Sequence, residues 1–180
     1  MKLSITLCTA EHLDELVELS RTTFIHAFKD QNNPDDFEEY LKGAFGRNTL
    51  AAELSNIHSS FYFVHCDAVL AGYFKLNFAD AQTELQDPGS VEIERIYVQH
   101  DFQGRGIGQW MISRIIEIAE QKEMEYVWLG VWEKNADAIR FYQAHGFNKF
   151  CEHPYYVGQD KQTDWLMRAD MITLRDKNPV

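Results

Sequence analysis

The stretch from Val91 to Gly108, VEIERIYVQHDFQGRGIG, limits what this chain can fold into more than any other segment. It begins as a strand rich in β-branched and aromatic residues over Val91–Val98, and a short polar turn follows at Gln99–Asp101. A glycine-spaced loop, Gln103–Gly108, then opens a helix whose apolar residues share one face. A loop between a strand and a helix amino terminus presents backbone N–H groups and the helix dipole to one place. The segment therefore predicts a site for an anionic phosphate.

Glycines at 104, 106 and 108 let this loop turn sharply and approach an anion without Cβ interference. The loop is not a Walker A motif, because no Gly-Lys-Ser/Thr ends it, and it does not match GxGxxG. Two other interpretations stay open. One is a strand–helix turn with no ligand, and the other is a phosphate-binding fold of unrelated activity.

The rest of the sequence predicts a single α+β domain over residues 1–180, without repeats or linkers. Alternating and β-rich segments predict strands at 3–8, 61–64, 69–78, 126–131, 147–151 and 163–171. Helical spacing and capping residues predict helices from about 9 to 28, from 34 to 45, from 48 to 57 and from 135 to 145. We expect an exposed loop at 79–90, a loop at 153–161 and a bulge at Gly72.

Composition narrows the class of protein. A net charge of -11 argues against a nucleic-acid partner and suits a cationic substrate, although many proteins are simply acidic. Three separated cysteines (8, 66 and 151) predict reduced thiols rather than a disulfide framework or a zinc site, and we expect no metal. The absence of a signal-like start and of a long apolar run predicts a cytoplasmic protein without a membrane partner.

Two motifs carry a resemblance to a known family. Gln103-Gly104-Arg105-Gly106-Ile107-Gly108 resembles the (Arg/Gln)-x-x-Gly-x-(Gly/Ala) signature of the GNAT superfamily of acetyl-CoA-dependent N-acetyltransferases. Asn135 to Phe147 is similar to that family's second motif, N-x-x-A-x-x-x-Y-x-x-x-G-F. More narrowly, GYFKLN, EIERIYV, WLGVWE and QTD resemble bacterial spermidine/spermine acetyltransferases of the PaiA kind. The resemblance implies a mixed, mostly antiparallel sheet of about six to seven strands flanked by helices.

The same resemblance implies which residues hold acetyl-CoA. The backbone at Ile96, Tyr97 and Val98 would bind the pantetheine arm, and Gln103 to Gly108 would bind the pyrophosphate. Asn135 would cap the second-motif helix or contact the cofactor. Tyr142 would protonate the departing thiolate, unless it is only a core residue. Positive charge would come from Arg105, and from Lys134 or Arg140 unless these two are simply solvated.

An amine acceptor must lose a proton before it attacks a thioester. An alkylammonium with a pKa near 10.4 is neutral in only about one molecule in 2,500 at pH 7, a cost of about 4.6 kcal/mol. Glu92 and Glu94 share one face of the central strand, where buried carboxylates need a reason. We expect one to bind the amine and the other to act as base, with Glu92 favoured by its position in the family. The alternative is a salt bridge to Arg95 or to a neighbouring strand.

The predicted function is direct acetyl transfer in a ternary complex to a small cationic amine, with polyamines first and an amino-acid or peptide amine second. A group near the last strands, Asp164 with Tyr155, Tyr156 and Trp165, is a weaker prediction for binding a polyamine through charge and cation–π contact. The rival from another class is a non-catalytic acyl-CoA sensor. A homodimer is among the expected assemblies.

Overall fold

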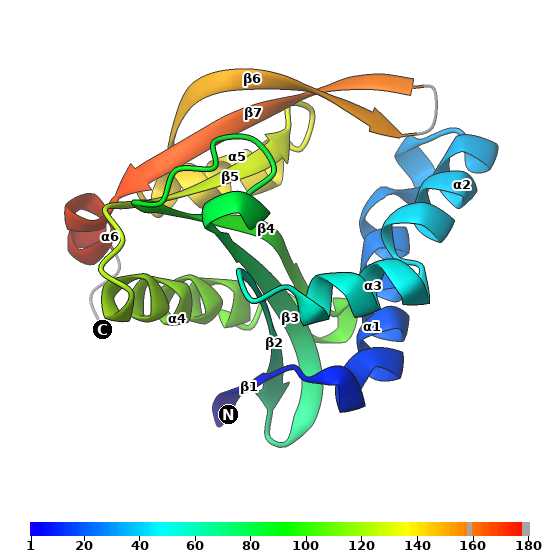
Figure 1. The fold of residues 1–180 in the computed structure, drawn as a ribbon, viewed down its shortest axis with the longest axis horizontal. Coiled ribbons are helices and arrows are strands. Elements are labelled where there is room, and N and C mark those ends of the chain that lie inside the picture. Colours follow the sequence, from blue (N-terminus) through cyan, green and yellow to red (C-terminus); the bar gives the residue numbers. More distant parts are fainter. Residues whose placement is uncertain (158–159, 178–180) are drawn as a thin grey trace. The chain divides into compact units, whose positions relative to one another are not determined.

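The computed structural model describes residues 1–157 and 160–177 (Figure 1). Its strands form one seven-stranded sheet in the order β1-β2-β3-β4-β5-β7-β6, so the predicted α+β class and the sheet of about six to seven strands are confirmed. The strands are β1 (Leu3–Leu7), β2 (Ser59–Cys66), β3 (Val69–Phe78), β4 (Ser90–Val98), β5 (Tyr126–Trp132), β6 (Asn148–Val157) and β7 (Asp160–Asp170). The α-helices are α1 (Leu13–Phe28), α2 (Pro34–Ala44), α3 (Arg47–Ser55), α4 (Ile107–Gln121), α5 (Ala136–Ala144) and α6 (Met171–Lys177).

The chain divides into two compact units that interleave along the sequence. Unit 1 comprises residues 1–75, 95–108 and 156–160, and unit 2 comprises residues 76–94, 109–155 and 161–180. A single domain over 1–180 stays a prediction.

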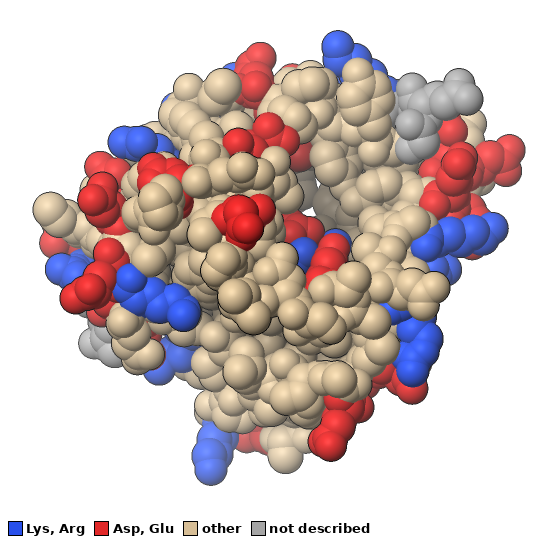
Figure 2. All heavy atoms as spheres, in the orientation of Figure 1, with Lys and Arg blue, Asp and Glu red and all other residues tan. Residues whose placement is uncertain are grey.

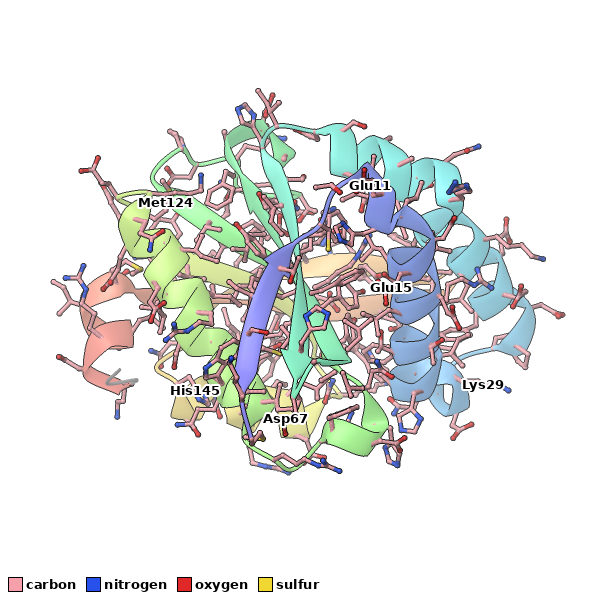
Figure 3. The ribbon with its side chains drawn as sticks, turned by 90° about the horizontal axis from the view of Figure 1, so that it is seen from below. Glu11, Glu15, Lys29, Asp67, Met124 and His145 are labelled. Atoms are coloured by element: carbon pink, nitrogen blue, oxygen red, sulfur yellow. The ribbon has the colours of Figure 1, made fainter. Side chains whose placement is uncertain are left out.

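Unit 1 pairs its first two strands antiparallel, in a register from Leu3↔Cys66 to Leu7↔Tyr62. Helix α1 follows a short 3-10 turn, with Glu11 and Glu15 near its amino-terminal end and Lys29 just past its last residue (Figure 3). Acidic side chains at the start of a helix stabilise it by interacting favourably with the helix dipole. Apolar side chains from β2, β3 and these helices are fully buried together, among them Leu16, Leu50, Phe61, Phe63 and Tyr73.

Aromatic rings dominate a second part of unit 1. Phe24 of α1 contacts Phe37, Tyr40 and Phe45, with ring centroids 4.9–5.6 Å apart. Asn33 caps α2 as predicted, because its side chain accepts hydrogen bonds from the N–H groups of the first turn, and Pro34 occupies the first helical position. The predicted start of this helix is confirmed.

Unit 2 contains the parallel pair of the sheet. β4 and β5 are in register from Ser90↔Tyr126 to Glu92↔Trp128, and β5 pairs antiparallel with β7 from Tyr126↔Asp170 to Trp132↔Asp164. Trp128 and Leu129 point to opposite faces of the sheet and both are buried, so β5 is covered on both faces as predicted. Gly146 ends α5 in the left-handed region at φ 98°, as predicted from its position.

Three predictions about local structure were wrong. The segment 153–157 belongs to β6 and not to a loop; residues 158 and 159 of that predicted loop lie outside the described residues. The final strand ends at Asp170, and α6 follows it. The loop at 79–89, called the β3–β4 loop below, is not simply exposed, because Gln82 is only 2% exposed. At Gly72 the backbone approaches closely, because a Cβ there would lie 2.3 Å from the carbonyl oxygen of Tyr97, and the bulge predicted at this residue stays a prediction.

Candidate active site

The glycine loop leaves β4 through a 3-10 turn at His100–Phe102 and reaches α4 at Ile107. Gly104 and Gly106 have φ of 71° and 77°, where L side chains are strained, and an added Cβ at either position would meet open space. Residues 103–106 are exposed, whereas Ile107 is buried and fixes the start of the helix. The loop thus combines left-handed glycines, free surface and a helix amino terminus, which fits a phosphate group.

Two side chains of this loop contact residues that lie close by in the sequence. The amide Nε2 of Gln103 donates to the Val98 carbonyl at 3.1 Å, which ties the loop to the end of β4. The Arg105 guanidinium is exposed and lies 5.3 Å from the centre of the Phe102 ring. Arg105 therefore supplies a solvent-facing positive charge within the loop.

The end of β4 carries the residues predicted for the pantetheine arm. Ile96, Tyr97 and Val98 are half-buried. The Tyr97 ring stacks on Tyr73 at 5.8 Å and meets Phe24 edge-on at 6.4 Å. The side chain of Tyr97 is therefore a packing element of unit 1, and a role for the backbone of this segment stays a prediction.

Tyr142 lies on α5, the helix of the second motif. Asn135 caps the helix, since its side-chain oxygen accepts from the Ala138 N–H at 3.2 Å. Desolvation raises the pKa of the Tyr142 hydroxyl above its ordinary value, so that hydroxyl stays protonated at neutral pH. The Tyr142 ring contacts Phe141 and Phe147.

The cations expected beside this helix are exposed. Lys134 lies over the Trp132 ring at 5.7 Å, and Arg140 pairs with Asp137 one turn earlier. Exposed pairs of this kind contribute little to stability. A contribution of either cation to cofactor binding stays a prediction.

Glu92 is a buried carboxylate, only 3% exposed. It accepts hydrogen bonds at Oε2 from the Thr83 N–H (2.9 Å) and the Asn77 side-chain amide (3.1 Å), and at Oε1 from the Thr83 hydroxyl (2.6 Å). All three donors are neutral groups. Burial is the largest influence and raises the pKa of Glu92, while these donors lower it and the nearby charge of Glu94 raises it further. Asn77, Thr83, Glu92 and Glu94 are called the Glu92 site below.

Glu94 lies two residues further along the same face of β4. Its Oε2 accepts from the Asn77 amide at 2.5 Å, so one asparagine bonds both glutamates. The two glutamates therefore share one face of β4, as predicted. Arg95, on the opposite face, is directed to Glu53 of α3 with N–O distances of 2.9 and 3.2 Å. Glu53 also forms an ion pair with Lys75, with 3.0 Å between Oε2 and Nζ.

Asp164 on β7 is a stronger candidate for binding a cationic substrate than the sequence alone indicates. Its Oδ1 atom is buried and has no hydrogen-bond partner among the described residues. Desolvation raises the pKa of this carboxyl to about 6, and the nearby His153 opposes that increase. Its Oδ2 lies 3.5 Å from where a Cβ on Gly130 of β5 would be. Buried acceptors nearly always have a hydrogen-bond partner, so this oxygen is suited to accept a hydrogen bond from a bound donor.

Sequence reasoning missed Asn77 and Thr83. Asn77 is fully buried near the end of β3, and a single asparagine within a largely apolar strand is the signal in the sequence that points to it. Thr83 lies in a polar segment that was expected to face solvent. The following residue, Glu84, pairs with Nε2 of His153 on β6 at 2.9 Å, so this segment also bonds toward the last strands.

Other expectations concern metals, thiols and membranes. Within residues 1–157 and 160–177, no three His, Cys, Asp or Glu side chains gather as a metal ion would require. All three cysteines are free, and burial raises the pKa of Cys8 to about 12. No described helix has both the length and the apolar character needed to cross a membrane. Acidic and basic side chains are interspersed on the face shown in Figure 2.

Comparison with known proteins places these features in a family. Residues 13–147, three quarters of the chain, match the model of the acetyltransferase (GNAT) family. The chain belongs to this family. It is thus an acetyl-CoA-dependent N-acetyltransferase, and the predicted superfamily and enzyme class are confirmed.

Relatives of this GNAT protein differ in how much of it they match. An uncharacterized N-acetyltransferase in the pepI 3′ region of Lactobacillus delbrueckii subsp. lactis is 40% identical over 89% of this chain and 92% of its own. The spermine/spermidine N(1)-acetyltransferase of Bacillus subtilis is 30% identical over 43% of this chain and 52% of its own. The PaiA N-acetyltransferase of Thermoplasma acidophilum, in complex with coenzyme A, shares the fold with a TM-score of 0.75 at 19% identity, covering 94% and 99% of the two chains. The predicted GNAT fold is confirmed.

Proposed function

We propose that this GNAT protein acetylates a small cationic amine, a polyamine in the first place, by direct transfer in a ternary complex. The observation that carries the proposal is the buried carboxylate of Glu92, whose pKa is raised by desolvation while three neutral donors hold it in place. A carboxylate with a raised pKa is a stronger base than one in water. Glu92 therefore takes the proton that the ammonium must lose.

Acetyl-CoA, when bound, supplies the activated thioester. On this chain, Gly104 and Gly106 fit the diphosphate, because their left-handed backbone and open Cβ positions leave the loop free for an anion. Arg105 adds the positive charge that an acidic protein needs near a phosphate. Backbone N–H groups of β4 are the proposed oxyanion donors.

Tyr142 is the proposed general acid. Its pKa is raised by desolvation, so the hydroxyl carries its proton at neutral pH and donates it to the departing sulfur. A tyrosine that only packed against its neighbours would need its ring and not its hydroxyl. The Tyr142→Phe variant separates these two roles because it keeps the ring contacts with Phe141 and Phe147.

A cationic acceptor is supported by the carboxylates on one face of unit 2. The register places Glu92 beside Trp128 and Trp128 beside Arg168. Because side chains alternate along strands, Gly130 of β5 and Asp164 of β7 lie on this same face. Gly130 is exposed and has no side chain, and the Asp164 carboxylate lies over it with one oxygen unpartnered among the described residues. An ammonium group would satisfy that oxygen.

Relatives with named substrates support both classes of amine acceptor to a similar degree. The B. subtilis relative is named for spermine and spermidine, but it matches less than half of this chain. The second candidate, an amino-acid or peptide amine, is favoured by a ribosomal protein bS18-alanine N-acetyltransferase of Escherichia coli, 31% identical over 44% of the chain. The carboxylates of Glu92, Glu94 and Asp164, called the anionic face below, outnumber Arg168, the cation that the register of β4, β5 and β7 places on this face. This face therefore fits a substrate with more than one positive charge better than a single terminal amine.

Steady-state acetylation of an amine panel tests the proposal. The panel contains spermidine, spermine, diamines of different length, monoamines, free amino acids and a peptide with an amino-terminal alanine. We expect kcat/KM to be highest for the polyamines and to follow the number of positive charges. A preference for the peptide would select the second candidate. Binding of acetyl-CoA without acetylation of any amine would overturn the proposal.

A non-catalytic sensor is distinguished by the Tyr142→Phe variant. We expect this variant to lose about 10- to 100-fold in kcat, in line with the loss of a general acid. Its affinity for coenzyme A, measured by calorimetry, should stay within about twofold of wild type. A sensor would show no turnover to lose. Unchanged kcat in an active enzyme would remove Tyr142 from the mechanism.

A further inference from the structure

The β3–β4 loop is anchored in unit 2 by a buried side-chain amide. Gln82 uses its whole hydrogen-bonding capacity: Nε2 donates to the carbonyls of Asp87 (2.8 Å) and Ser90 (3.2 Å), and Oε1 accepts from Trp128 Nε1 (2.7 Å) and the Ser90 hydroxyl (3.0 Å). All of these partners are in the loop itself, at the start of β4 or on β5. The loop is therefore fixed directly beside Thr83.

The far end of the loop is held as well. Asp87 accepts from the Gly89 N–H at 2.8 Å and from the Tyr126 hydroxyl at 2.7 Å. These two bonds lower the pKa of Asp87, which keeps the aspartate ionised. Figure 1 shows this loop in green after β3. A loop fixed at both ends presents the intervening residues in one conformation.

Thr83 uses that fixed position to hold Glu92. Its N–H donates to Oε2 and its hydroxyl donates to Oε1, so one residue bonds both carboxylate oxygens. Thr83 itself is exposed, whereas Glu92 is 3% exposed. A shape-filling role in the core does not explain an exposed threonine. Two-point bonding instead fixes the rotation of the carboxylate plane and favours its ionised form.

We propose that Thr83 is the positioning residue of the proposed base: its hydroxyl and N–H orient the Glu92 carboxylate and keep it ionised at neutral pH. The inference rests on the proposed function in taking Glu92 as base. The titratable group on the same face of β4 is Glu94, which opposes ionisation of Glu92, and Asn77 bridges the two glutamates. Thr83 offsets the burial and the like charge that both favour the neutral acid.

The test removes one bond at a time. Thr83→Val deletes the hydroxyl and keeps the backbone N–H, and Thr83→Ser keeps both. Because Thr83 is exposed, we expect both variants to fold. The acidic limb of the kcat/KM–pH profile should move to higher pH by roughly half a unit to one unit in Thr83→Val. Thr83→Ser should restore the wild-type limb. A limb that stays in place in Thr83→Val would overturn the inference.

A threonine elsewhere gives a matched control. Thr49 also donates its hydroxyl over a short distance, to the Gly43 carbonyl at 2.8 Å, and it belongs to α3 in unit 1. Thr49→Val removes a comparable hydrogen bond and leaves Glu92 untouched. We expect its pH profile to match wild type. An equal shift in Thr49→Val would mean that any lost hydroxyl moves the profile, and the inference would fail.

A measurement without turnover separates this inference from the proposed function. Carbon NMR of glutamate-labelled protein follows the titration of the Glu92 carboxyl, assigned by its absence in Glu92→Gln. We expect the Glu92 pKa to be higher in Thr83→Val, and also in Thr83→Ala, which serves the same purpose if the valine variant does not fold. An inactive wild type with a raised Glu92 pKa in these variants would refute the proposed function alone. An unchanged Glu92 pKa would refute the inference alone.

Discussion

The glycine loop at residues 103–108 and the Glu92 site are built in opposite ways. The loop is made from six consecutive residues, it is exposed at 103–106, and its working parts are backbone groups shaped by φ near +70° at two glycines. The Glu92 site is assembled from two strands and an intervening loop, it is buried around Glu92, and its working parts are side chains. The loop is formed by residues that are adjacent in the sequence, whereas the Glu92 site depends on tertiary contacts.

This difference separates binding from chemistry. A backbone cradle on the surface binds an anion with N–H groups that do not titrate themselves. A buried carboxylate changes its own pKa because its surroundings replace water. We therefore expect changes in the loop to affect affinity for coenzyme A, and changes around Glu92 to affect turnover. Each prediction below tests that division.

The largest expected effect comes from Glu92→Gln. The amide keeps the shape of the side chain but cannot accept a proton from the amine, so we expect kcat/KM to fall by about 10²- to 10⁴-fold. Coenzyme A affinity should be unchanged in calorimetry. Glu94→Gln is the matched change two residues further along β4. The variant with the larger loss of kcat/KM identifies the base. A loss of coenzyme A affinity as large as the loss of turnover would contradict the division between the two sites.

The sequence predicted the loop better than the Glu92 site for a physical reason. Gly104, Gly106 and the start of α4 at Ile107 follow from neighbouring residues, because left-handed backbone and helix starts are local properties. Glu92 and Glu94 were placed on one face by strand alternation, which is also local. Their shared partner Asn77 was not predicted, because it comes from another strand.

Thr83 and Asp164 show what sequence alone could not supply. Thr83 lies in a polar segment that is typical of an exposed loop, and its two bonds to Glu92 depend on how Gln82 is fixed against Trp128. The unpartnered oxygen of Asp164 depends on burial and on the missing side chain at Gly130. Desolvation is a property of the folded surroundings, so no spacing of residues reports it.

A second prediction concerns stability and Asp164. Its pKa is about 6 in the folded protein and near 3.9 when unfolded, so folding favours the neutral acid. The stability that this preference contributes is fully present below pH 4 and is lost as the pH rises through about 6. Asp164→Asn does not titrate, so it should be more stable than wild type above pH 6, by up to about 3 kcal/mol, with no difference below pH 4.

Urea unfolding at several pH values between 4 and 8 measures this difference. Asp170→Asn, at the exposed end of the same strand, is the matched control and should change stability by less than about 0.5 kcal/mol at every pH. A gap that does not widen between pH 4 and pH 6 would show that Asp164 is solvated. The anionic face would then lose its desolvated member, and with it part of the argument for a cationic acceptor.

The smallest expected effect is in the loop, with Gly106→Ala. An added Cβ meets nothing within 4 Å, so any effect comes from the backbone or from the ligand. At φ 77° an alanine costs about 1–2 kcal/mol, which shifts the loop away from the conformation that suits an anion. We expect coenzyme A to bind roughly 5- to 30-fold more weakly, with kcat at saturating acetyl-CoA close to wild type. Gly43→Ala also adds a Cβ in open space, but inside α2, where alanine stabilises a helix by about 0.5–1 kcal/mol. It should leave coenzyme A affinity unchanged, and equal weakening in both variants would remove the special role of the left-handed backbone at Gly106.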